Sequence, residues 1–467
     1  MAAEPVAGYL RDSIPGYWSY TPEKQMDAPD ATDGWWRGFN DSLLDSLINA
    51  GIENNYNVLM AMRRAGIARA TMMQARAQWF PTVSADLSWN KSHQSGATTV
   101  PTEPGEGVSY FSAGLSAQWE IDIFGKIASG VKARKADYMA SRAEYAGAMV
   151  SVCAQIADTY IQLREYQQQL AVAERHSENQ MKIVEIAKAR FETTLASKLD
   201  VAQALETYYS TTASIPMLHN SIQKTINALA VLTGIPLDRA KALLSSPGQL
   251  PEYLRAVSAG IPADLLRRRP AIAEAEMQLA ADAAQVGIAK KDFLPTLSIA
   301  GSIGTEAHRA GDLFSGDSFT WSVVPTLSWT VFDGLSRKYS LAAARQTMQA
   351  AIDNYNLAVQ TAVQETDNAL STYTHSLLYV DAIQKVIEQN NEELSLAVQR
   401  YKNSLSPMSD VVNALLRSLA AENSLITAKG QALSALVQLY EALGGGFDAA
   451  DLAGDGSPLP GIPAQTR

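Results

Sequence analysis

The feature that most constrains this sequence is an internal repeat that covers most of its 467 residues. Anchors in the first half recur 210 residues later: Trp119, Arg190, Leu195, Asp200, Ala204 and Gly234 correspond to Trp329, Arg400, Leu405, Asp410, Ala414 and Gly444. The segments 80–84 and 294–298 also match, at an offset of 214 residues. A loop between Pro81 and Trp119 can absorb the difference, because loops tolerate insertions. Agreement at several separated anchors predicts a tandem duplication.

Each half contains two short stretches in which apolar and polar residues alternate strictly. Alternation with period two is typical of a strand with one apolar and one polar face. It predicts β-hairpins at 82–91/110–120 in the first half and at 296–304/319–330 in the second. The apolar faces of these strands include Leu87, Leu115, Trp119, Ile299, Trp321, Leu327 and Trp329. We expect these residues to face lipid.

The length and the ends of these strands favour a membrane barrel over a soluble sandwich. About ten residues are enough for a tilted strand to cross a bilayer, and tryptophans stand near the strand ends, as in an interfacial aromatic girdle. A sandwich would need its strands grouped, whereas long helical stretches separate these two hairpins. Four strands cannot close a membrane barrel, since the smallest natural ones have about eight. The sequence therefore predicts a barrel shared between chains, with eight strands from two copies or twelve from three.

Most of the remaining sequence is predicted to be helical. No proline occurs between Gly125 and Pro216, and apolar residues between Tyr355 and Tyr401 recur at steps of three and four, which predicts a coiled-coil-like seam. A helix over 127–191 would be about 95 Å long. A second long helix would follow a turn and run to Leu232, with an irregularity at Pro216. Symmetric copies would gather such helices into a tube that continues the barrel.

These patterns divide the chain into five parts. The expected division is an N-terminal extended segment (1–40), a first repeat (41–234) with a helix-pair tip near 193–197, a linker (235–262), a second repeat (263–444) with a tip near 403–407, and a C-terminal tail (445–467). The linker and both ends are richer in proline and glycine than the repeats.

Composition and spacing exclude several classes of function. The net charge of −10 and the pI of about 5.2 argue against nucleic acid as the main partner. The single cysteine, Cys153, cannot form an internal disulfide. No histidines have metal-ligand spacing and no phosphate-binding loop occurs, so we expect no catalytic residue, metal or cofactor. The N-terminus shows no signal peptide, and no stretch approaches the roughly 18 apolar residues of a membrane-spanning helix.

Four motifs together resemble outer-membrane factors of the TolC/OprM type. They are Trp35-Trp36-Arg37 with Phe39-Asn40-Asp41, then WEIDIFGK (119–126), RRPAIAEAE (268–276) and FDGL (332–335). The resemblance implies an α+β membrane protein: a homotrimer whose four strands per chain form a 12-stranded outer-membrane β-barrel, continued by a long periplasmic α-helical barrel. It also implies a periplasmic adaptor and an inner-membrane pump as partners, with the RND class expected first. Many relatives of this subtype carry a lipidated cysteine at the mature N-terminus, and this chain has none there.

The turns between paired helices are the expected sites of gating and docking. Ser197 to Asp200 predicts a capping box, and Ser406-Pro407 predicts an N-cap followed by proline. In the resemblance, the gate positions fall on Asp200, Tyr401, Asp410 and Asn413. The family's gate arginine falls on Ser406 and one acidic ring position on Asn413, which implies a less acidic gate. The expected adaptor contacts are Thr194, Leu195, Leu405 and Ser406.

The function expected from these observations is a passive outer-membrane exit duct of a tripartite efflux system, opened at its tips by the adaptor. Two alternatives remain open. One is the outer-membrane component of a type I protein-secretion machine, which has the same fold. The other is a periplasmic coiled-coil scaffold that never enters a bilayer.

Overall fold

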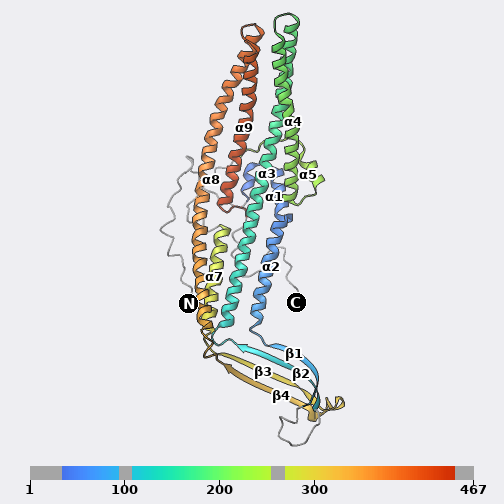
Figure 1. Ribbon diagram of the computed structural model, residues 1–467, viewed down its shortest axis with the longest axis vertical. Coiled ribbons are helices and arrows are strands. Elements are labelled where there is room, and N and C mark those ends of the chain that lie inside the picture. The colour runs from blue at the N-terminus through green and yellow to red at the C-terminus, as the bar shows by residue number, and fades with distance from the viewer. Residues whose placement is uncertain (1–33, 94–107, 254–268, 447–467) are drawn as a thin grey trace. The chain divides into compact units, whose positions relative to one another are not determined.

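The computed structural model describes residues 34–93, 108–253 and 269–446, in which long helices accompany one four-stranded sheet (Figure 1). Its contacts divide the chain into two compact units. The helical unit comprises residues 1–64, 141–274 and 356–467, and the sheet unit comprises 65–140 and 275–355. Parts of the expected end segments, linker and second repeat lie outside the described residues, namely 1–33, 254–268 and 447–467.

Long helices dominate both halves of the chain, and each half pairs a helix of 67 residues with one of 35 or 36. The long helices are α2 (Tyr56–Ala77), α3 (Lys126–Glu192), α4 (Lys198–Thr233), α7 (Pro270–Lys291), α8 (Ser336–Lys402) and α9 (Met408–Ala442). The shorter ones are η1 (Trp35–Phe39), α1 (Ser42–Asn54) and α5 (Leu237–Leu244). Neither 67-residue helix contains a proline. Helix α4 is continuous across Pro216, where an irregularity was expected.

The two tip turns begin their second helices differently. At the start of α4 the expected capping box is present: the backbone N–H of Asp200 donates to Ser197 Oγ (3.2 Å), and the N–H of Ser197 donates to Asp200 Oδ2 (3.1 Å). At the start of α9 the prediction is wrong by one residue, because Pro407 is the N-cap rather than Ser406. Pro407 occupies the position that Ser197 has in the other turn and has no side-chain oxygen, so α9 lacks a side-chain cap.

The core of the helical unit is built around the first motif of the family resemblance. Trp35 is 1% exposed and stacks on Tyr440 with ring centroids 5.3 Å apart. Asp41 caps α1 by accepting from the N–H groups of Leu43 (2.9 Å) and Leu44 (3.2 Å), and it also accepts from the hydroxyl of Tyr160 (2.6 Å). Burial raises the pKa of Tyr160. These conspicuous residues therefore hold the fold together.

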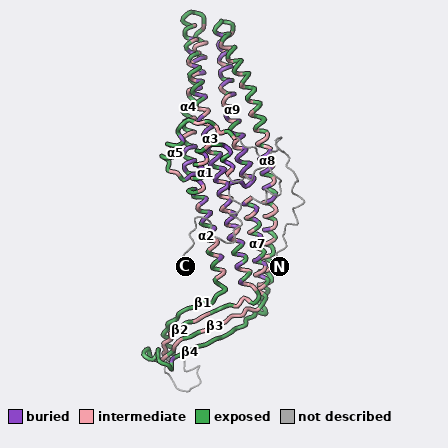
Figure 2. Tube along the Cα trace, turned by 180° about the vertical axis from the view of Figure 1, so that it is seen from behind, coloured by how far each residue is buried: buried purple, intermediate pink, exposed green. Residues whose placement is uncertain are grey.

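The sheet unit contains a single antiparallel sheet in the order β1-β2-β3-β4 (Figure 1). Its strands are β1 (Thr82–Ser92), β2 (Val108–Ile121), β3 (Thr296–Ala307) and β4 (Phe319–Ser328). Each half of the chain supplies one hairpin, and β2 pairs with β3 to join the halves. Figure 2 shows the outer strands β1 and β4 exposed along their whole length. Within the described residues, each of these two strands has one edge without a hydrogen-bonded neighbour.

Matched contacts in the sheet unit hold the tryptophans where helix and strand meet. The indole N–H of Trp119 donates to the carbonyl of Trp79 (3.0 Å), and that of Trp329 donates to the carbonyl of Phe293 (3.1 Å). Trp329 lies just beyond β4, which ends at Ser328. A polar ring edge bound to backbone, with the ring itself exposed, suits a residue at a membrane surface.

Candidate functional site

One face of the sheet is mostly apolar. The strand register places Ala85, Leu115, Ile303 and Trp321 in one row across all four strands, and the row of Val83, Ala117, Gly301 and Val323 lies beside it. Leu87 is 79% exposed, Trp321 70% and Leu327 66%. The seven expected lipid-facing residues all belong to this face, except that Trp329 follows the end of β4. An exposed apolar face that crosses a whole sheet indicates a surface for lipid or another apolar partner.

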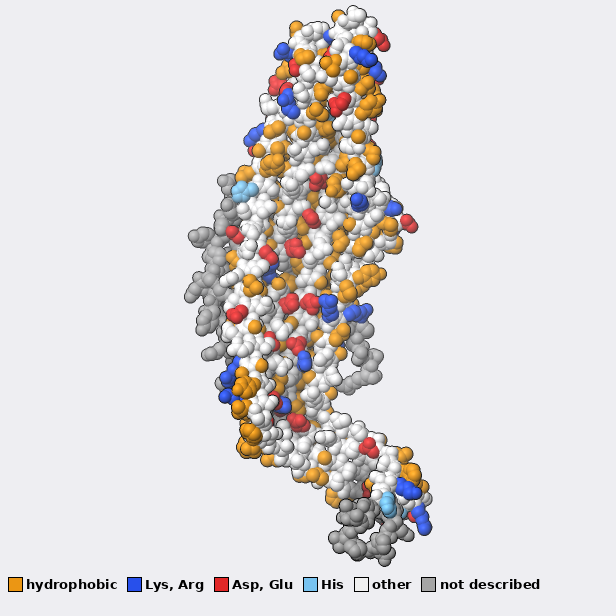
Figure 3. Space-filling model, viewed as in Figure 1, with side chains coloured by type: hydrophobic (Ala, Val, Ile, Leu, Met, Phe, Trp, Pro, Cys, Tyr) orange, Lys and Arg blue, Asp and Glu red, His pale blue; other side chains and the backbone are white. Residues whose placement is uncertain are grey.

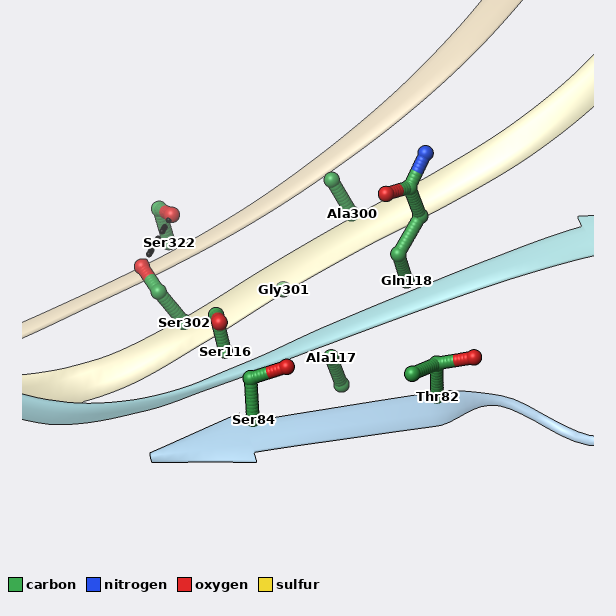
Figure 4. Close-up of a pocket in the computed structure, with 9 residues that line it drawn as sticks. All are labelled: Thr82, Ser84, Ser116, Ala117, Gln118, Ala300, Gly301, Ser302 and Ser322. Atoms are coloured by element: carbon green, nitrogen blue, oxygen red, sulfur yellow. Dashed lines mark hydrogen bonds between the residues drawn. The ribbon is translucent and has the colours of Figure 1, made fainter. Parts of the chain in front are cut away.

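The opposite face of the sheet is polar. Ser84, Ser116, Ser302 and Ser322 stand in register across the four strands (Figure 4). The hydroxyls of Ser302 and Ser322 are 2.7 Å apart, and Ser116 donates to Asp86 Oδ2 (3.0 Å). Figure 4 shows the four serines lining one pocket with Thr82 and Gln118. A barrel closed from such sheets with the apolar face outward has hydroxyls lining its interior.

Two glycines on the polar face let the middle strands approach closely. Gly114 of β2 is opposite Gly304 of β3. A Cβ atom at Gly304 would lie 2.6 Å from the carbonyl oxygen of Ala113, and one at Gly114 would lie 2.9 Å from that of Ile303. Glycine inside a strand commonly marks a bend or a close backbone approach. A side chain at either glycine would therefore clash with the backbone of the neighbouring strand.

The tip turns, 193–197 and 403–407, share one backbone geometry. Thr194 and Ser404 both have positive φ, 63° and 59°. The N–H of Leu195 donates to the carbonyl of Arg190 at 2.8 Å, and that of Leu405 donates to the carbonyl of Arg400 at 2.8 Å. The residues 210 positions apart therefore occupy equivalent places in the two tips.

Arg190, which the sequence interpretation missed, joins the two tips. Its Nη1 donates to the carbonyl of Lys402 (2.8 Å) and its Nη2 to Ser404 Oγ (2.7 Å), while its guanidinium lies 4.9 Å from the ring centre of Tyr401. Tyr401 is 4% exposed and packs with Val184 and other apolar residues of both hairpins. The recurrence of arginine at 190 and 400 was the available sequence signal.

The other expected gate residues lie close in sequence to this cluster but differ in exposure. Burial raises the pKa of Tyr401, the negative charge of Asp200 adds to the rise, and the charge of Arg190 opposes both. Asp200 is half-buried, whereas Asp410 and Asn413 are exposed on α9. The structure therefore buries Tyr401, engages Asp200 in the capping box of α4, and leaves Asp410 and Asn413 at the surface of a single chain.

The expected adaptor contacts lie at the ends of the two tips. Leu195 is 64% exposed and Leu405 is 67% exposed, and Thr194 beside them is exposed as well. Ser406 is half-buried, and its hydroxyl oxygen is buried without a hydrogen bond in the described residues. The two leucines are thus presented to solvent, which a packing role within their own hairpin would not require.

Acidic side chains follow the long helices, a feature that sequence interpretation missed. Asp137, Glu144, Asp158 and Glu165 recur on α3 at multiples of seven residues, which was the available signal. In the helical unit, burial raises the pKa of Glu165 and the charge of Asp158 raises it further. Burial and the charge of Glu144 likewise raise the pKa of Glu274. Figure 3 shows acidic side chains in red along the helices of the face it presents.

The remaining chemistry of the described residues is sparse. They contain no group of three or more His, Cys, Asp or Glu side chains arranged to hold a metal ion. Cys153 is fully buried, and burial raises the pKa of its thiol to about 12, so it is an unreactive core residue. His308 in the sheet unit contacts the carbonyl of Ser109 through Nδ1 (2.9 Å).

In the part of the chain that the structure describes, every helix is too short or too polar to cross a membrane.

Comparison with known proteins identifies the family. The model of the family described as outer membrane efflux protein matches residues 47–235 and again 261–445. The chain belongs to this family. As an outer membrane efflux protein it is an efflux channel of the TolC/OprM type, and its family is one of transport proteins.

Relatives cover nearly the whole chain. Outer membrane protein OprJ of Pseudomonas aeruginosa is 29% identical over 432 residues, which are 92% of this chain and 90% of that one. The structure of the outer-membrane channel OprN aligns with a TM-score of 0.84 at 29% identity, over 93% of this chain and 99% of that one. Outer membrane protein VceC of Vibrio cholerae aligns with a TM-score of 0.82 at 27% identity, over 90% of this chain and 100% of that one. In this outer membrane efflux protein, the candidate functional surfaces are the two faces of the sheet and the two tips.

Proposed function

We propose that this chain is the outer-membrane exit duct of a tripartite efflux system and works as a passive homotrimeric channel. Three copies would pair β4 of one chain with β1 of the next and close a 12-stranded barrel. The long helices would continue it into the periplasm as a helical barrel. A periplasmic adaptor would open the tips, and an inner-membrane pump of the RND class would supply the energy.

The observation that carries this proposal is the sheet: one apolar face, one hydroxyl-lined face and two unpaired edges. An open edge is a template for another strand, and closure removes it. In a bilayer every backbone polar group must be satisfied internally, so the edges must pair with those of other copies. The apolar face then meets lipid.

The partners are inferred from the tips and from the relatives. A relative from Pseudomonas putida, 29% identical over 92% of this chain, bears the name antibiotic efflux pump outer membrane protein ArpC. The described residues of this chain contain no nucleotide-binding motif. Another component of the efflux system would therefore supply the energy. The exposed leucines at 195 and 405 offer the adaptor an apolar contact on each tip.

Single-channel recording in planar bilayers, combined with light scattering in detergent, tests the proposal. We expect a particle of three 50.4 kDa chains that inserts and conducts weakly at rest. The control is the variant Leu115→Arg, which should insert poorly because it places a charge on the lipid face. A monodisperse monomer in detergent-free buffer that never inserts would support the coiled-coil scaffold instead.

A further inference from the structure

The contact made by Arg190 within one chain has an unused counterpart at Arg400. Arg190 and Arg400 occupy equivalent positions, and each donates through Nη2 to the carbonyl of its own turn, Leu195 (3.4 Å) or Leu405 (3.5 Å). Arg190 then reaches across to the other hairpin, to Lys402 and Ser404. Arg400 is exposed, and the Leu405 carbonyl is its one hydrogen-bond partner in the described residues.

The groups that Arg190 binds are all repeated 210 residues earlier. The carbonyl of Lys402 corresponds to that of Glu192, the hydroxyl of Ser404 to that of Thr194, and the ring of Tyr401 to that of Phe191. Thr194 shares with Ser404 the positive φ that places the hydroxyl at the turn. Tyr401 is 4% exposed under Arg190, whereas Phe191 is 45% exposed. Arg400 and the equivalent groups of the first tip are thus both present, but the described residues contain no hydrogen bond between them.

This repetition is selective. Farther from the tips, Arg175 and Glu422 form an ion pair between the two hairpins. Their equivalents are Lys385 and Thr212, which cannot form one. This ion pair is therefore not repeated, whereas the arginine and the groups it binds at the tip are present in both repeats.

We propose that Arg400 binds the first tip of a neighbouring copy of this chain, with its guanidinium over Phe191 and its N–H groups on the Glu192 carbonyl and the Thr194 hydroxyl. The inference rests on the proposed trimer. If the second hairpin is related to the first hairpin of the next copy as the first hairpin is to the second, that next copy lies beside Arg400. In a closed trimer, the same arrangement then recurs around the ring. Three contacts within chains then alternate with three between chains around the closed tips. Thr194, expected to contact the adaptor, belongs to the subunit interface.

Paired cysteines test this arrangement in the full-length protein purified in detergent, in a Cys153→Ala background. The test pair is Thr194→Cys with Arg400→Cys, and the control pair is Ser404→Cys with Arg190→Cys. A bifunctional thiol reagent is chosen for a span that cross-links the control pair. We expect the control to stay at monomer size on a non-reducing gel, and the test pair to lose its monomer band to covalent dimers and trimers.

A test pair that stays unlinked, or links only within one chain, would overturn the inference. If light scattering still shows a trimer and bilayer recordings show that it conducts, the proposed function stands and only the tip contact fails. A particle of one chain would instead overturn the proposed function. A second measurement is the resting conductance: Arg400→Ala and Arg400→Lys should both raise it about as much as Arg190→Ala does, since lysine lacks the planar fork. No change in conductance for Arg400→Ala contradicts the proposal.

Discussion

Placing a charge on the apolar face of the sheet gives a sharp test of which face meets lipid. Leu115 is half-exposed in the middle of β2, seven residues after Val108 and six before Ile121, with Ala85 and Ile303 beside it in register. A strand of 14 residues rises about 46 Å and, tilted at about 45°, spans about 33 Å. In the proposed barrel, position 115 would therefore lie near the midplane of a bilayer about 30 Å thick.

The expected cost follows from that depth. Leu115→Arg should lower the free energy of unfolding by about 2–4 kcal/mol per chain, because arginine at the midplane of a lipid-facing strand costs that much. In a trimer the loss is counted three times. Ser116→Arg should be nearly neutral, since Ser116 points to the polar face and already lies 3.0 Å from Asp86 Oδ2, which can pair with the new charge.

The assay is denaturant unfolding of the protein refolded into lipid vesicles, followed by tryptophan fluorescence and by the loss of the trimer band on an unheated gel. The midpoint should fall for Leu115→Arg and stay near that of the unsubstituted protein for Ser116→Arg. Equal midpoints for the two variants would show that neither face of the sheet meets lipid. A larger fall in the midpoint for Ser116→Arg would show that the polar face, rather than the apolar face, meets lipid.

Four further predictions concern the tips, the acidic helices and the close approach of β2 to β3. Asp410→Ala should weaken cation preference and block by multivalent cations in single-channel recordings, because carboxylates confined in a narrow opening attract cations. Leu195→Asp combined with Leu405→Asp should abolish efflux in cells, with normal trimer yield. Glu441→Gln should raise the free energy of unfolding at pH 7 but not at pH 4. Burial raises the pKa of Glu441, so protonation stabilises the fold at low pH and this gain is lost as pH rises through that pKa. Gly114→Val should cost about 1–3 kcal/mol by overpacking, measured by denaturant unfolding.

Each of these predictions has a matched control. Asp200→Ala should affect block less than Asp410→Ala and helix stability more, since Asp200 completes the capping box. Glu178→Gln changes an exposed carboxylate and should leave stability unaltered at both pH values. Gly301→Val should be tolerated, because its Cβ would meet nothing closer than 3.7 Å. Loss of trimer in the double leucine variant would show that the leucines pack within the fold, contrary to a docking role.

Local patterns in the sequence were enough to predict the strands and the longest helices. Strict alternation located all four strands, and a long stretch without proline located α3, which ends within one residue of the expected 127–191 at each end. The register of the sheet could not be read in the same way. Close approach of Gly114 and Gly304 depends on how β2 meets β3, and these strands are far apart in sequence. Such pairings are decided by tertiary contacts that local propensity does not contain.

The surroundings of the expected gate residues were harder to predict, because they depend on contacts between the two hairpins. The resemblance pointed to Tyr401, but its burial under Arg190 follows from contact between residues 211 positions apart. A family motif names positions, whereas pairing depends on which groups the folded hairpins bring within reach. The shift of the α9 N-cap from Ser406 to Pro407 has a simpler cause. The sequence is compatible with a helix start at either residue, and in the folded turn Pro407 is the N-cap.

If the proposed channel opens at its tips, the difference between the two tips suggests which contacts would break. The start of α4 is held by the Ser197–Asp200 box, but α9 has no side-chain cap, so the second hairpin depends more on its neighbours. Arg190 supplies two hydrogen bonds to that hairpin and a cation–π contact. At about 0.5–1.5 kcal/mol for each hydrogen bond and about 0.5–1 for the cation–π contact, this connection is worth about 1.5–4 kcal/mol. In the proposed channel, an energy of that size would help to keep the tips closed at rest, and a partner that binds them with micromolar affinity, about 8 kcal/mol, could overcome it. Opening by an adaptor is therefore energetically reasonable if its contacts on Leu195 and Leu405 favour a state in which Arg190 has released Lys402 and Ser404.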